Sequence, residues 1–262
     1  MASARPVALV TGASSGIGAE FARQLAARGF DLILVARRKE RLEQLAATLQ
    51  TNCEILPADL ESPEECRMVA GRIATEPRLL MLINNAGFGT KYRFWELPLE
   101  TNLAMHELHV MAAVELTHAA LKAMVPRGDG AVINVASVAG FATSPSNVSY
   151  CATKAWMVAF TEGLELELRG LRSGVQTQAL CPGFTYSEFH DVAGVSRDTI
   201  PKHLWMSAES VVRASLNALK HRRMIVIPGW KYRLFVRVFG LLPRRLRMYI
   251  QLRSSHTKSR MR

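Results

Sequence analysis

Short apolar runs alternate with longer amphipathic stretches along most of the 262 residues, and this alternation constrains the fold more than any other feature. The apolar runs predict strands at residues 6–11, 31–36, 54–57, 79–84, 131–136, 175–181 and 223–227. The amphipathic stretches predict helices at residues 17–28, 39–50, 62–75, 99–124, 148–170 and 207–220. Several runs are apolar throughout, as expected where helices cover both faces of a parallel sheet. The order predicts an α/β fold with a single doubly wound, Rossmann-type parallel sheet of about seven strands flanked by helices.

The composition limits the kind of protein that this chain can be. Hydrophobic residues make up 49% of the chain and charged residues 21%, which supports a sizeable core and excludes a disordered chain. No apolar run reaches the ~18 residues that a membrane-spanning helix needs, and the N-terminus has no signal-peptide layout. The four cysteines show no CxxC spacing, and no metal site is predicted. We therefore expect a protein of the reducing cytoplasm.

Positive charge is concentrated toward the C-terminus. The formal net charge is +11, yet no Asp or Glu follows Glu209, whereas fourteen Lys and Arg residues lie from Arg213 onward. The part before Arg213 is therefore close to neutral. These features predict a main domain over residues 1–228 and a basic amphipathic extension over residues 229–262.

A glycine-rich turn follows the first predicted strand and opens the first helix, with the sequence Thr11-Gly12-Ala13-Ser14-Ser15-Gly16-Ile17-Gly18. Gly12 permits a tight turn, Gly16 lets the backbone approach a pyrophosphate, and Gly18 lets helix and strand pack closely. Ser14, Ser15 and the free N–H groups at the helix start then face the phosphate charge. The spacing is GxxxGxG and not the common GxGxxG, so the position at the first strand–helix junction is what favours a dinucleotide site over a glycine-rich loop without a ligand.

Four further motifs follow in order along the chain. Asn84-Asn85-Ala86-Gly87 comes after the fourth strand, and Ser137 ends the fifth. Tyr150 lies 13 residues beyond Ser137 and begins a YxxxK motif that ends at Lys154. Pro182-Gly183 follows the sixth strand. Together with the glycine-rich turn, these motifs make residues 6–227 resemble the short-chain dehydrogenase/reductase family, nearest to its 3-oxoacyl and hydroxysteroid ketoreductases.

Ser137, Tyr150 and Lys154 are the predicted catalytic residues. Tyr150 and Lys154 lie four residues apart on a predicted helix and share a face, so the ammonium group should lower the pKa of the phenol and suit it to proton transfer. Ser137, at a carboxyl end of the sheet, can hydrogen-bond the reacting oxygen. The resemblance implies that Lys154 also holds the nicotinamide ribose and that Tyr150 exchanges a proton while hydride passes between cofactor and substrate. Taken singly, Tyr150 could be a core aromatic and Ser137 a strand-end cap.

The resemblance implies further contacts to a nicotinamide cofactor. Asp59, with Leu60, follows the third strand where the family binds the adenine amino group, although an ordinary helix-start Asp is an equal alternative. Asn85, Ala86 and Gly87 would approach the adenosine ribose. The Pro182-Gly183 turn would lie beside the nicotinamide. The predicted cofactor residues are Gly12, Ser14, Ser15, Gly16, Ile17, Gly18, Arg37, Arg38, Asp59, Leu60, Asn85, Ala86, Gly87, Tyr150, Lys154, Pro182, Gly183 and Thr185.

The end of the second strand indicates which nicotinamide cofactor is used. NAD-preferring enzymes place an acidic residue there to hold the adenosine 2′-hydroxyl. Here the strand ends in Ala36-Arg37-Arg38, with no acid and two arginines. Guanidinium groups suit a phosphate dianion through charge-assisted hydrogen bonds, so the sequence predicts NADP(H). A solvated helix start is the alternative for a lone arginine.

His109 marks a departure from the family pattern. The family usually has an Asn eight residues before a Thr in the helix after NNAG, and alignment on Leu116-Thr117 places His109 at that position. The Asn is held to keep a kink and a water that passes protons onward from the lysine. A histidine can also bind water and titrates near neutrality, so His109 is a candidate relay residue, with a packing histidine as the equal alternative.

Residues 184–207 correspond to the segment that covers the substrate in the family. Phe184, Phe189, Trp205 and Met206 would suit an apolar or acyl ketone, although they could equally be core residues under a lid. The predicted substrate contacts are Ser137, Tyr150, Phe184 and Phe189. The resulting prediction is an NADP(H)-dependent oxidoreductase that interconverts a ketone and a secondary alcohol.

The extension beyond residue 228 has an amphipathic pattern. Leu234, Phe235, Val238, Leu241 and Leu242 cluster on one helical face, Arg233, Arg237, Arg244 and Arg247 lie on the other, and Pro243 must break or kink the helix. Interleaved aromatic and basic residues suit an anionic membrane surface, so a peripheral membrane protein is one prediction. Pocket closure or subunit contact in a homo-oligomer is the other.

Two other functions compete with the enzyme. A non-catalytic NADP(H) sensor or scaffold is possible because the fold alone does not establish activity, although an intact Ser137, Tyr150 and Lys154 argue against it. The basic extension also suggests nucleic-acid binding. That function is disfavoured because the sequence contains no recognised nucleic-acid-binding module.

Overall fold

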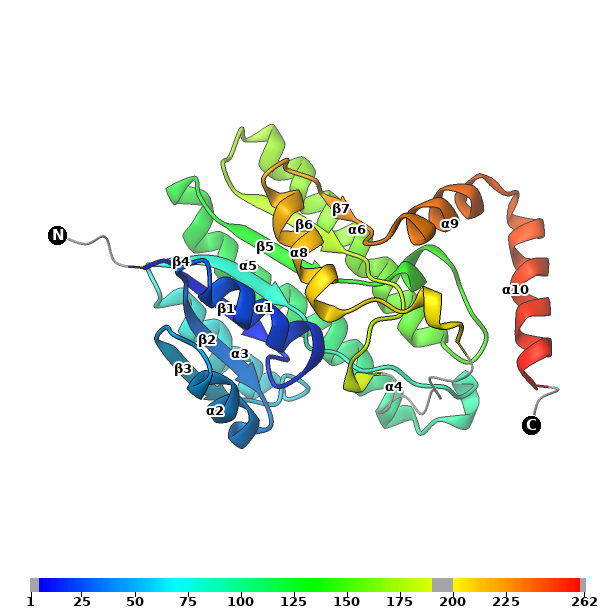
Figure 1. Ribbon diagram of the computed structural model, residues 1–262, viewed down its shortest axis with the longest axis horizontal. Coiled ribbons are helices and arrows are strands. Elements are labelled where there is room, and N and C mark those ends of the chain that lie inside the picture. Colours follow the sequence, from blue (N-terminus) through cyan, green and yellow to red (C-terminus); the bar gives the residue numbers. More distant parts are fainter. Residues whose placement is uncertain (1–4, 190–199, 260–262) are drawn as a thin grey trace.

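A seven-stranded parallel sheet forms the centre of the protein (Figure 1). The computed structural model describes residues 5–189 and 200–259, with side chains through residue 253. The strands are β1 (Val7–Thr11), β2 (Asp31–Ala36), β3 (Cys53–Pro57), β4 (Leu79–Asn84), β5 (Ala131–Val135), β6 (Gln176–Leu180) and β7 (Ile225–Val226). Their order across the sheet is β3-β2-β1-β4-β5-β6-β7. The predicted fold class is thereby confirmed, although the last strand has only two residues.

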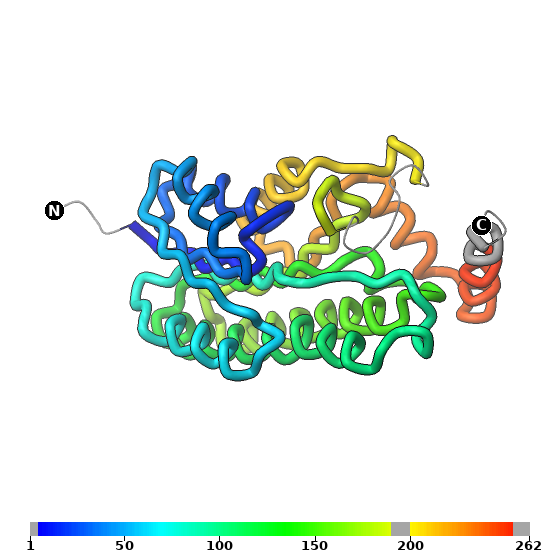
Figure 2. Tube along the Cα trace, turned by 90° about the horizontal axis from the view of Figure 1, so that it is seen from below, coloured from blue at the N-terminus to red at the C-terminus, as the bar shows by residue number. Residues whose placement is uncertain are grey.

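Helices cover both faces of this sheet, as Figure 2 shows. The helices are α1 (Gly16–Ala26), α2 (Lys39–Ala47), α3 (Pro63–Ala74), α4 (Leu99–His106), α5 (Ala112–Arg127), α6 (Val148–Gly170), α8 (Ala208–Leu219), α9 (Trp230–Leu241) and α10 (Arg244–Ser259). Helices α1, α2 and α8 pack on one face through Phe21, Leu42 and Val212. Helices α3, α5 and α6 pack on the other face. The apolar strands are buried on both sides because each face has its own helical layer.

The predicted helix at 99–124 consists of three segments. A π-helical turn, η2 (Glu107–Met111), separates α4 from α5. Single π-helical turns inside α-helices often occur at functional sites, because they reposition one side chain. Here the residue in the turn that becomes fully buried is His109.

The whole stretch Leu99–Arg127 is long and apolar enough, by length and composition, to cross a membrane, contrary to the prediction that the sequence holds no such segment. In the fold, its α5 part packs against α3 and β4. Leu116, Ala120 and Met124 are buried in that contact. Core packing therefore accounts for part of the apolar composition, since 39% of the most apolar part of this stretch is buried.

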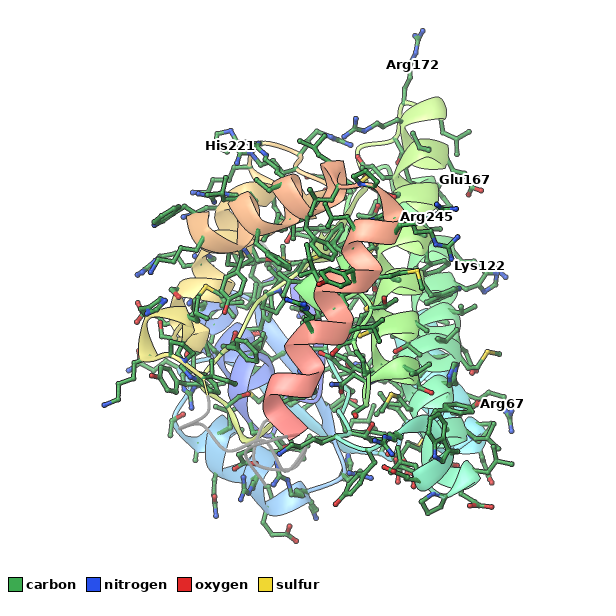
Figure 3. The ribbon with its side chains drawn as sticks, turned by 90° about the vertical axis from the view of Figure 1, so that its right-hand side faces the viewer. Arg67, Lys122, Glu167, Arg172, His221 and Arg245 are labelled. Carbon is green, nitrogen blue, oxygen red and sulfur yellow. The ribbon has the colours of Figure 1, made fainter. Side chains whose placement is uncertain are left out.

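The C-terminal extension forms two helices that meet at Pro243, where the sequence predicts a break. At the start of α9, Tyr232 is buried against the main domain. Helix α10 stands off from the sheet and its helices, and Figure 3 shows it lying across one side of the molecule, with Arg245 at its first turn. A hydrogen bond of 3.0 Å between Thr143 Oγ1 and Gln251 Oε1 joins α10 to the loop before α6.

Candidate active site

The glycine-rich turn leaves the start of α1 open to an anion. Gly12 and Gly16 have φ angles of +64° and +54°, a region that favours glycine. A Cβ at Gly18 would lie 2.3 Å from the carbonyl oxygen of Gly12, so only glycine allows this approach. Ser15 is the N-cap residue, but its side chain accepts no capping hydrogen bond, and the first turn contains no acidic residue. These residues fit a cofactor pyrophosphate, because the side chain of Ser15 does not cap the first amides of α1.

The NNAG turn after β4 is joined directly to this glycine-rich turn. Asn85 Nδ2 donates to the carbonyl oxygen of Thr11 at 2.9 Å. The backbone N–H groups of Asn85 and Ala86 both donate to Thr11 Oγ1, at 2.9 and 3.0 Å. The carboxyl ends of β1 and β4 therefore lie together at the point where the strand order reverses, which is where such sheets bind their ligands.

Ser137, Tyr150 and Lys154 lie together beyond the end of β5. Ser137 forms the N-cap of η3 (Val138–Phe141), where its Oγ accepts from Ala139 N at 3.1 Å, and its hydroxyl lies near enough to that of Tyr150 to influence the pKa of the phenol. Lys154 Nζ donates to the carbonyl oxygen of Val135 at 2.7 Å and lies 5.9 Å from the centroid of the Tyr150 ring. The structure thus brings the three predicted catalytic side chains to one place.

The electrostatics of this triad differ from the sequence prediction. Burial raises the pKa of Tyr150 to about 12, and the Ser137 hydroxyl opposes this shift without cancelling it. Burial also lowers the pKa of Lys154 to about 8. Burial therefore outweighs any lowering of the phenol's pKa by the ammonium group, contrary to the expectation from the sequence. At neutral pH, Tyr150 is protonated and can donate a proton.

His109 is fully buried between the NNAG turn and α6. The N–H of Phe88 donates to His109 Nε2 at 3.1 Å. His109 Nδ1 lies 3.0 Å from Thr153 Oγ1, and Thr153 donates in turn to the carbonyl oxygen of Tyr150 at 3.0 Å. Burial, followed by the positive charge of Lys154, lowers the pKa of His109 well below its usual range. The imidazole is therefore neutral, and protein groups contact both ring nitrogens of the residue for which the sequence left a relay role and a packing role as equal alternatives.

The two arginines predicted to bind a 2′-phosphate point in different directions. Arg37 lies 3.2 Å from Glu61 and 3.7 Å from Asp59. Arg38 donates to Ser14 Oγ at 3.1 Å and to Glu188 at 3.0 Å. Arg41, which the sequence analysis missed, also pairs with Glu188. Its position three residues after Arg38 on a helix was the available signal, since such residues share a face.

Asp59 and Leu60 occupy the loop after β3. Asp59 Oδ1 accepts a hydrogen bond from the backbone N–H of Glu61, and Oδ2 faces Arg37. Asp59 does not begin a helix, because α3 starts at Pro63 with Ser62 as its N-cap. Leu60 is buried in the core cluster beneath α3. The structure therefore gives both residues contacts within the protein just beyond the end of β3.

The first part of the substrate segment lies beside the triad. The rings of Phe189 and Tyr150 are 5.6 Å apart between centroids, and those of Phe184 and Trp205 are 5.7 Å apart. Thr185 is buried, and its hydroxyl donates to the carbonyl oxygen of Gly183 at 3.0 Å. Residues 190–199 of the predicted 184–207 segment lie outside the described residues.

Tyr232 packs against the Pro182-Gly183 turn. The sequence analysis did not predict it as a site residue. A Cβ at Gly183 would lie 2.1 Å from the Tyr232 ring. The Tyr232 hydroxyl donates to the carbonyl oxygen of Leu204 at 2.6 Å and accepts from Phe184 N at 3.1 Å. No local sequence pattern indicates this contact, because the partners are 28 and 48 residues away along the chain. The start of α9 therefore belongs to the wall of the site.

A glycine-rich turn that suits a phosphate lies where the strand order of the sheet reverses, and two hydroxyl groups and a lysine lie next to it. This arrangement defines a dinucleotide-dependent oxidoreductase of the Rossmann type. Residues 6–195 match the family model for short chain dehydrogenases, and the chain belongs to this family. It is accordingly an enzyme that acts on CH–OH groups with NAD(P).

Three relatives show how far the similarity extends. A short-chain dehydrogenase from Sphingobium yanoikuyae, solved in complex with NADPH, is 35% identical, with a TM-score of 0.81 over 97% of this chain and 95% of that one. A bulky-bulky ketone specific alcohol dehydrogenase from Comamonas testosteroni is 29% identical, with a TM-score of 0.76 over 97% of this chain and 94% of that one. The 3-oxoacyl-[acyl-carrier-protein] reductase of Rickettsia prowazekii is 31% identical over 183 residues, which are 70% of this chain and 74% of the relative.

Proposed function

We propose that the protein is an NADP(H)-dependent enzyme that interconverts a ketone and a secondary alcohol, on an apolar or acyl substrate. The observation that carries the proposal is the placement of Ser137, Tyr150 and Lys154 together beyond the end of β5, at the same sheet edge as the glycine-rich turn. Two hydroxyl groups at this edge can both hydrogen-bond one substrate oxygen. The dinucleotide would bind nearby, where the strand order of the sheet reverses.

The proton step follows from the state of Tyr150. With its pKa raised to about 12, the phenol holds its proton at neutral pH and donates it to the carbonyl oxygen during reduction. Ser137 donates a second hydrogen bond to that oxygen and stabilises the developing charge. Bound NADPH supplies the hydride. Lys154, four residues after Tyr150 on α6, would hold the ribose hydroxyls of the cofactor and keeps positive charge near the phenol.

The preference for NADP(H) is supported by the charges at the end of β2. Arg37, Arg38 and Arg41 lie there, and no acidic residue replaces them at the position that would hold a 2′-hydroxyl. The relative from Sphingobium yanoikuyae was solved with NADPH. The apolar substrate is supported by the aromatic rings of Phe184, Phe189 and Trp205 near Tyr150, and one relative is specific for bulky ketones.

The experiment is an NADPH-oxidation screen over 3-oxoacyl thioesters, steroids and simple ketones, with NADH in parallel. We expect turnover of bulky apolar ketones with NADPH, and loss of it in Tyr150→Phe, because the variant has no proton to donate. NADPH binding without turnover of any ketone would favour a sensor or scaffold. A steep salt dependence of binding to DNA would favour the nucleic-acid function.

We further propose that residues 1–228 are the catalytic domain and that residues 229–262 are an extension. The extension either joins subunits of a homo-oligomer or rests on an anionic membrane. In the second case the protein would be cytoplasmic and peripheral to the membrane. The support is the exposed apolar surface of the extension. Leu234, Val238 and Leu241 on α9 and Met248 and Leu252 on α10 are each more than half exposed. Exposed apolar side chains on two successive helices are typical of a surface that binds a partner or a membrane.

A further inference from the structure

Helix α9 is apolar on two opposite faces. On its inner face Tyr232 and Phe239 are buried, and the helix packs against η3 of the main domain. The opposite face carries four large apolar side chains that are each more than half exposed, namely Trp230, Leu234, Val238 and Leu241. With 3.6 residues per turn, these four lie within about a quarter of the helix circumference. We call them the outer stripe, an apolar surface that nothing covers within the described part of the chain.

Positive charge borders the outer stripe on both sides. Lys231 lies on one border, with its ammonium group 5.9 Å from the centroid of the Trp230 ring. Arg233 and Arg237 lie on the other border, and both are exposed. No Asp or Glu follows Glu209 in the sequence, so the extension has no carboxylate side chain to pair with these cations. The face that α9 presents to solvent is therefore apolar along its middle and cationic at both edges.

This pattern fits an anionic lipid surface better than a second copy of the chain. A helix that lies in a membrane interface buries its apolar face at the boundary of headgroups and acyl chains, with Lys, Arg and Trp beside that face. Two copies that met through the outer stripe about a two-fold axis would bring the same cations face to face. That contact is unfavourable, because the extension has no acidic side chain to offset the repulsion.

The inner face of α9 holds both ends of the substrate segment. The Tyr232 hydroxyl donates to Leu204 O at 2.6 Å and accepts from Phe184 N at 3.1 Å. An α-helix with its side chains is about 10 Å across. The substrate segment therefore begins about one helix diameter from the outer stripe, and a membrane in contact with the stripe would lie next to the substrate site.

We propose that the outer stripe of α9 rests on an anionic membrane, and that the enzyme takes its substrate, a ketone with long apolar chains, from that membrane. This inference rests on the proposed conversion of a ketone to a secondary alcohol. A ketone of this class partitions into lipid and is scarce in water, so an enzyme held at the membrane surface meets it at a higher concentration. One helix then provides both the lipid contact and a wall of the substrate site.

Two matched pairs of substitutions in the full-length protein test the surface. The α9 pair, Leu234→Gln with Leu241→Gln, removes half of the outer stripe. The α6 pair, Leu166→Gln with Leu171→Gln, is the control, because these leucines are 68% and 69% exposed on and just after α6. Binding is measured by co-sedimentation with vesicles of phosphatidylcholine and phosphatidylserine, and with vesicles of phosphatidylcholine alone.

We expect wild type and the α6 pair to bind the vesicles that contain phosphatidylserine equally well. The α9 pair should bind them at least about ten-fold more weakly, because two leucines no longer gain from burial in lipid. All three proteins should bind vesicles of phosphatidylcholine alone more weakly than wild type binds the anionic ones, since those vesicles do not attract the cations.

The source of the substrate is tested with NADPH and two ketone probes. A dialkyl ketone with two long chains resides in the anionic vesicles, whereas acetophenone dissolves in water. We expect the α9 pair to lose about ten-fold in kcat/KM for the dialkyl ketone and to reduce acetophenone as wild type does, because the outer stripe faces away from the main domain. The α6 pair should match wild type on both probes.

Other outcomes overturn the proposal. Equal sedimentation of wild type and the α9 pair would remove the outer stripe from any lipid contact. A dimer in size-exclusion chromatography that the α9 pair abolishes, with no vesicle binding by wild type, would assign the stripe to a second copy. Equal losses on both ketones would show that the membrane is not the source of the substrate. Failure of the proposed function is a separate result, because wild type would then reduce neither ketone while its vesicle binding still depended on the outer stripe.

Discussion

His109 Nδ1 and Thr153 Oγ1 lie 3.0 Å apart in the interior of the protein, between the two halves of the active site. Because the N–H of Phe88 can only donate, Nε2 is the acceptor in that contact and Nδ1 carries the proton. The hydroxyl oxygen of Thr153 accepts a hydrogen bond from this Nδ1–H group, and the Thr153 hydroxyl donates a hydrogen bond to the carbonyl oxygen of Tyr150. One imidazole therefore connects the turn after β4 to the helix that carries Tyr150 and Lys154.

Replacing His109 tests this connection. We expect His109→Leu to lower kcat by about ten-fold or more, because it leaves the Phe88 N–H without an acceptor and releases Thr153, a cost of about 1–3 kcal/mol. NADPH affinity should change little. His109→Asn, which keeps polar atoms at this position, should be active. The measurements are steady-state kinetics and NADPH titration, and wild-type turnover in the leucine variant would contradict any role for His109 in turnover.

The pH profile separates a positioning histidine from a titrating one. Since the pKa of His109 lies well below its usual range, the imidazole stays neutral above pH 6.5. Wild type and His109→Asn should therefore have parallel kcat profiles between about pH 6.5 and 8. A step in the wild-type profile near pH 6.5 that is absent from the asparagine variant would show that His109 titrates during turnover.

Lys154 should make stability depend on pH in the alkaline range. Its pKa falls from 10.5 in the unfolded chain to about 8 in the folded protein, so between these values the unfolded state binds more protons. Stability from this group therefore rises with pH through that window, by up to about 2 kcal/mol between pH 8 and 9.5. Denaturant unfolding of wild type and Lys154→Met over this range measures it. As the pH rises, the free energy of unfolding of the wild type should increase relative to that of Lys154→Met. A difference that stays constant with pH would contradict the lowered pKa of Lys154.

Tyr232 should matter for both stability and substrate binding. Tyr232→Phe leaves Leu204 O and Phe184 N without their shared partner, so we expect a loss of about 1–3 kcal/mol in the free energy of unfolding. The KM for the ketone should rise, because Phe184 begins the substrate segment. Tyr92→Phe is the matched control, since Tyr92 is 59% exposed. Equal stability and equal KM in the two variants would show that the α9 contact is dispensable.

The extension gives a prediction about membranes. Arg244 and Arg245 are exposed at the start of α10, beside the exposed side chain of Leu246. The double variant Arg244→Glu, Arg245→Glu should co-sediment less than wild type with vesicles that contain phosphatidylserine, because each basic residue near the surface contributes about 1 kcal/mol. High salt should abolish the difference. If neither protein pellets at low salt, the membrane role is excluded and size-exclusion chromatography should show an oligomer in its place.

Local pattern predicted the parts of this protein that depend on neighbouring residues. Strands β1, β2 and β4 were located from runs of four or five consecutive apolar residues, as expected where both faces of a parallel strand are covered. The positive φ angles at Gly12 and Gly16 follow from a turn that only glycine adopts readily. The helix break at Pro243 follows from a missing N–H group.

Long-range packing decided the rest, since no pattern of neighbouring residues states which distant groups will meet or how deeply they will be buried. The sequence placed Lys154 on the same helical face as Tyr150 but could not show that desolvation raises the phenol's pKa to about 12. His109 was found by its departure from a motif, whereas its bond to Thr153 required the π-helical turn and α6 to pack together. Glu188 lies 150 residues from Arg38, so their ion pair exists only because the segment after β6 crosses the start of α1.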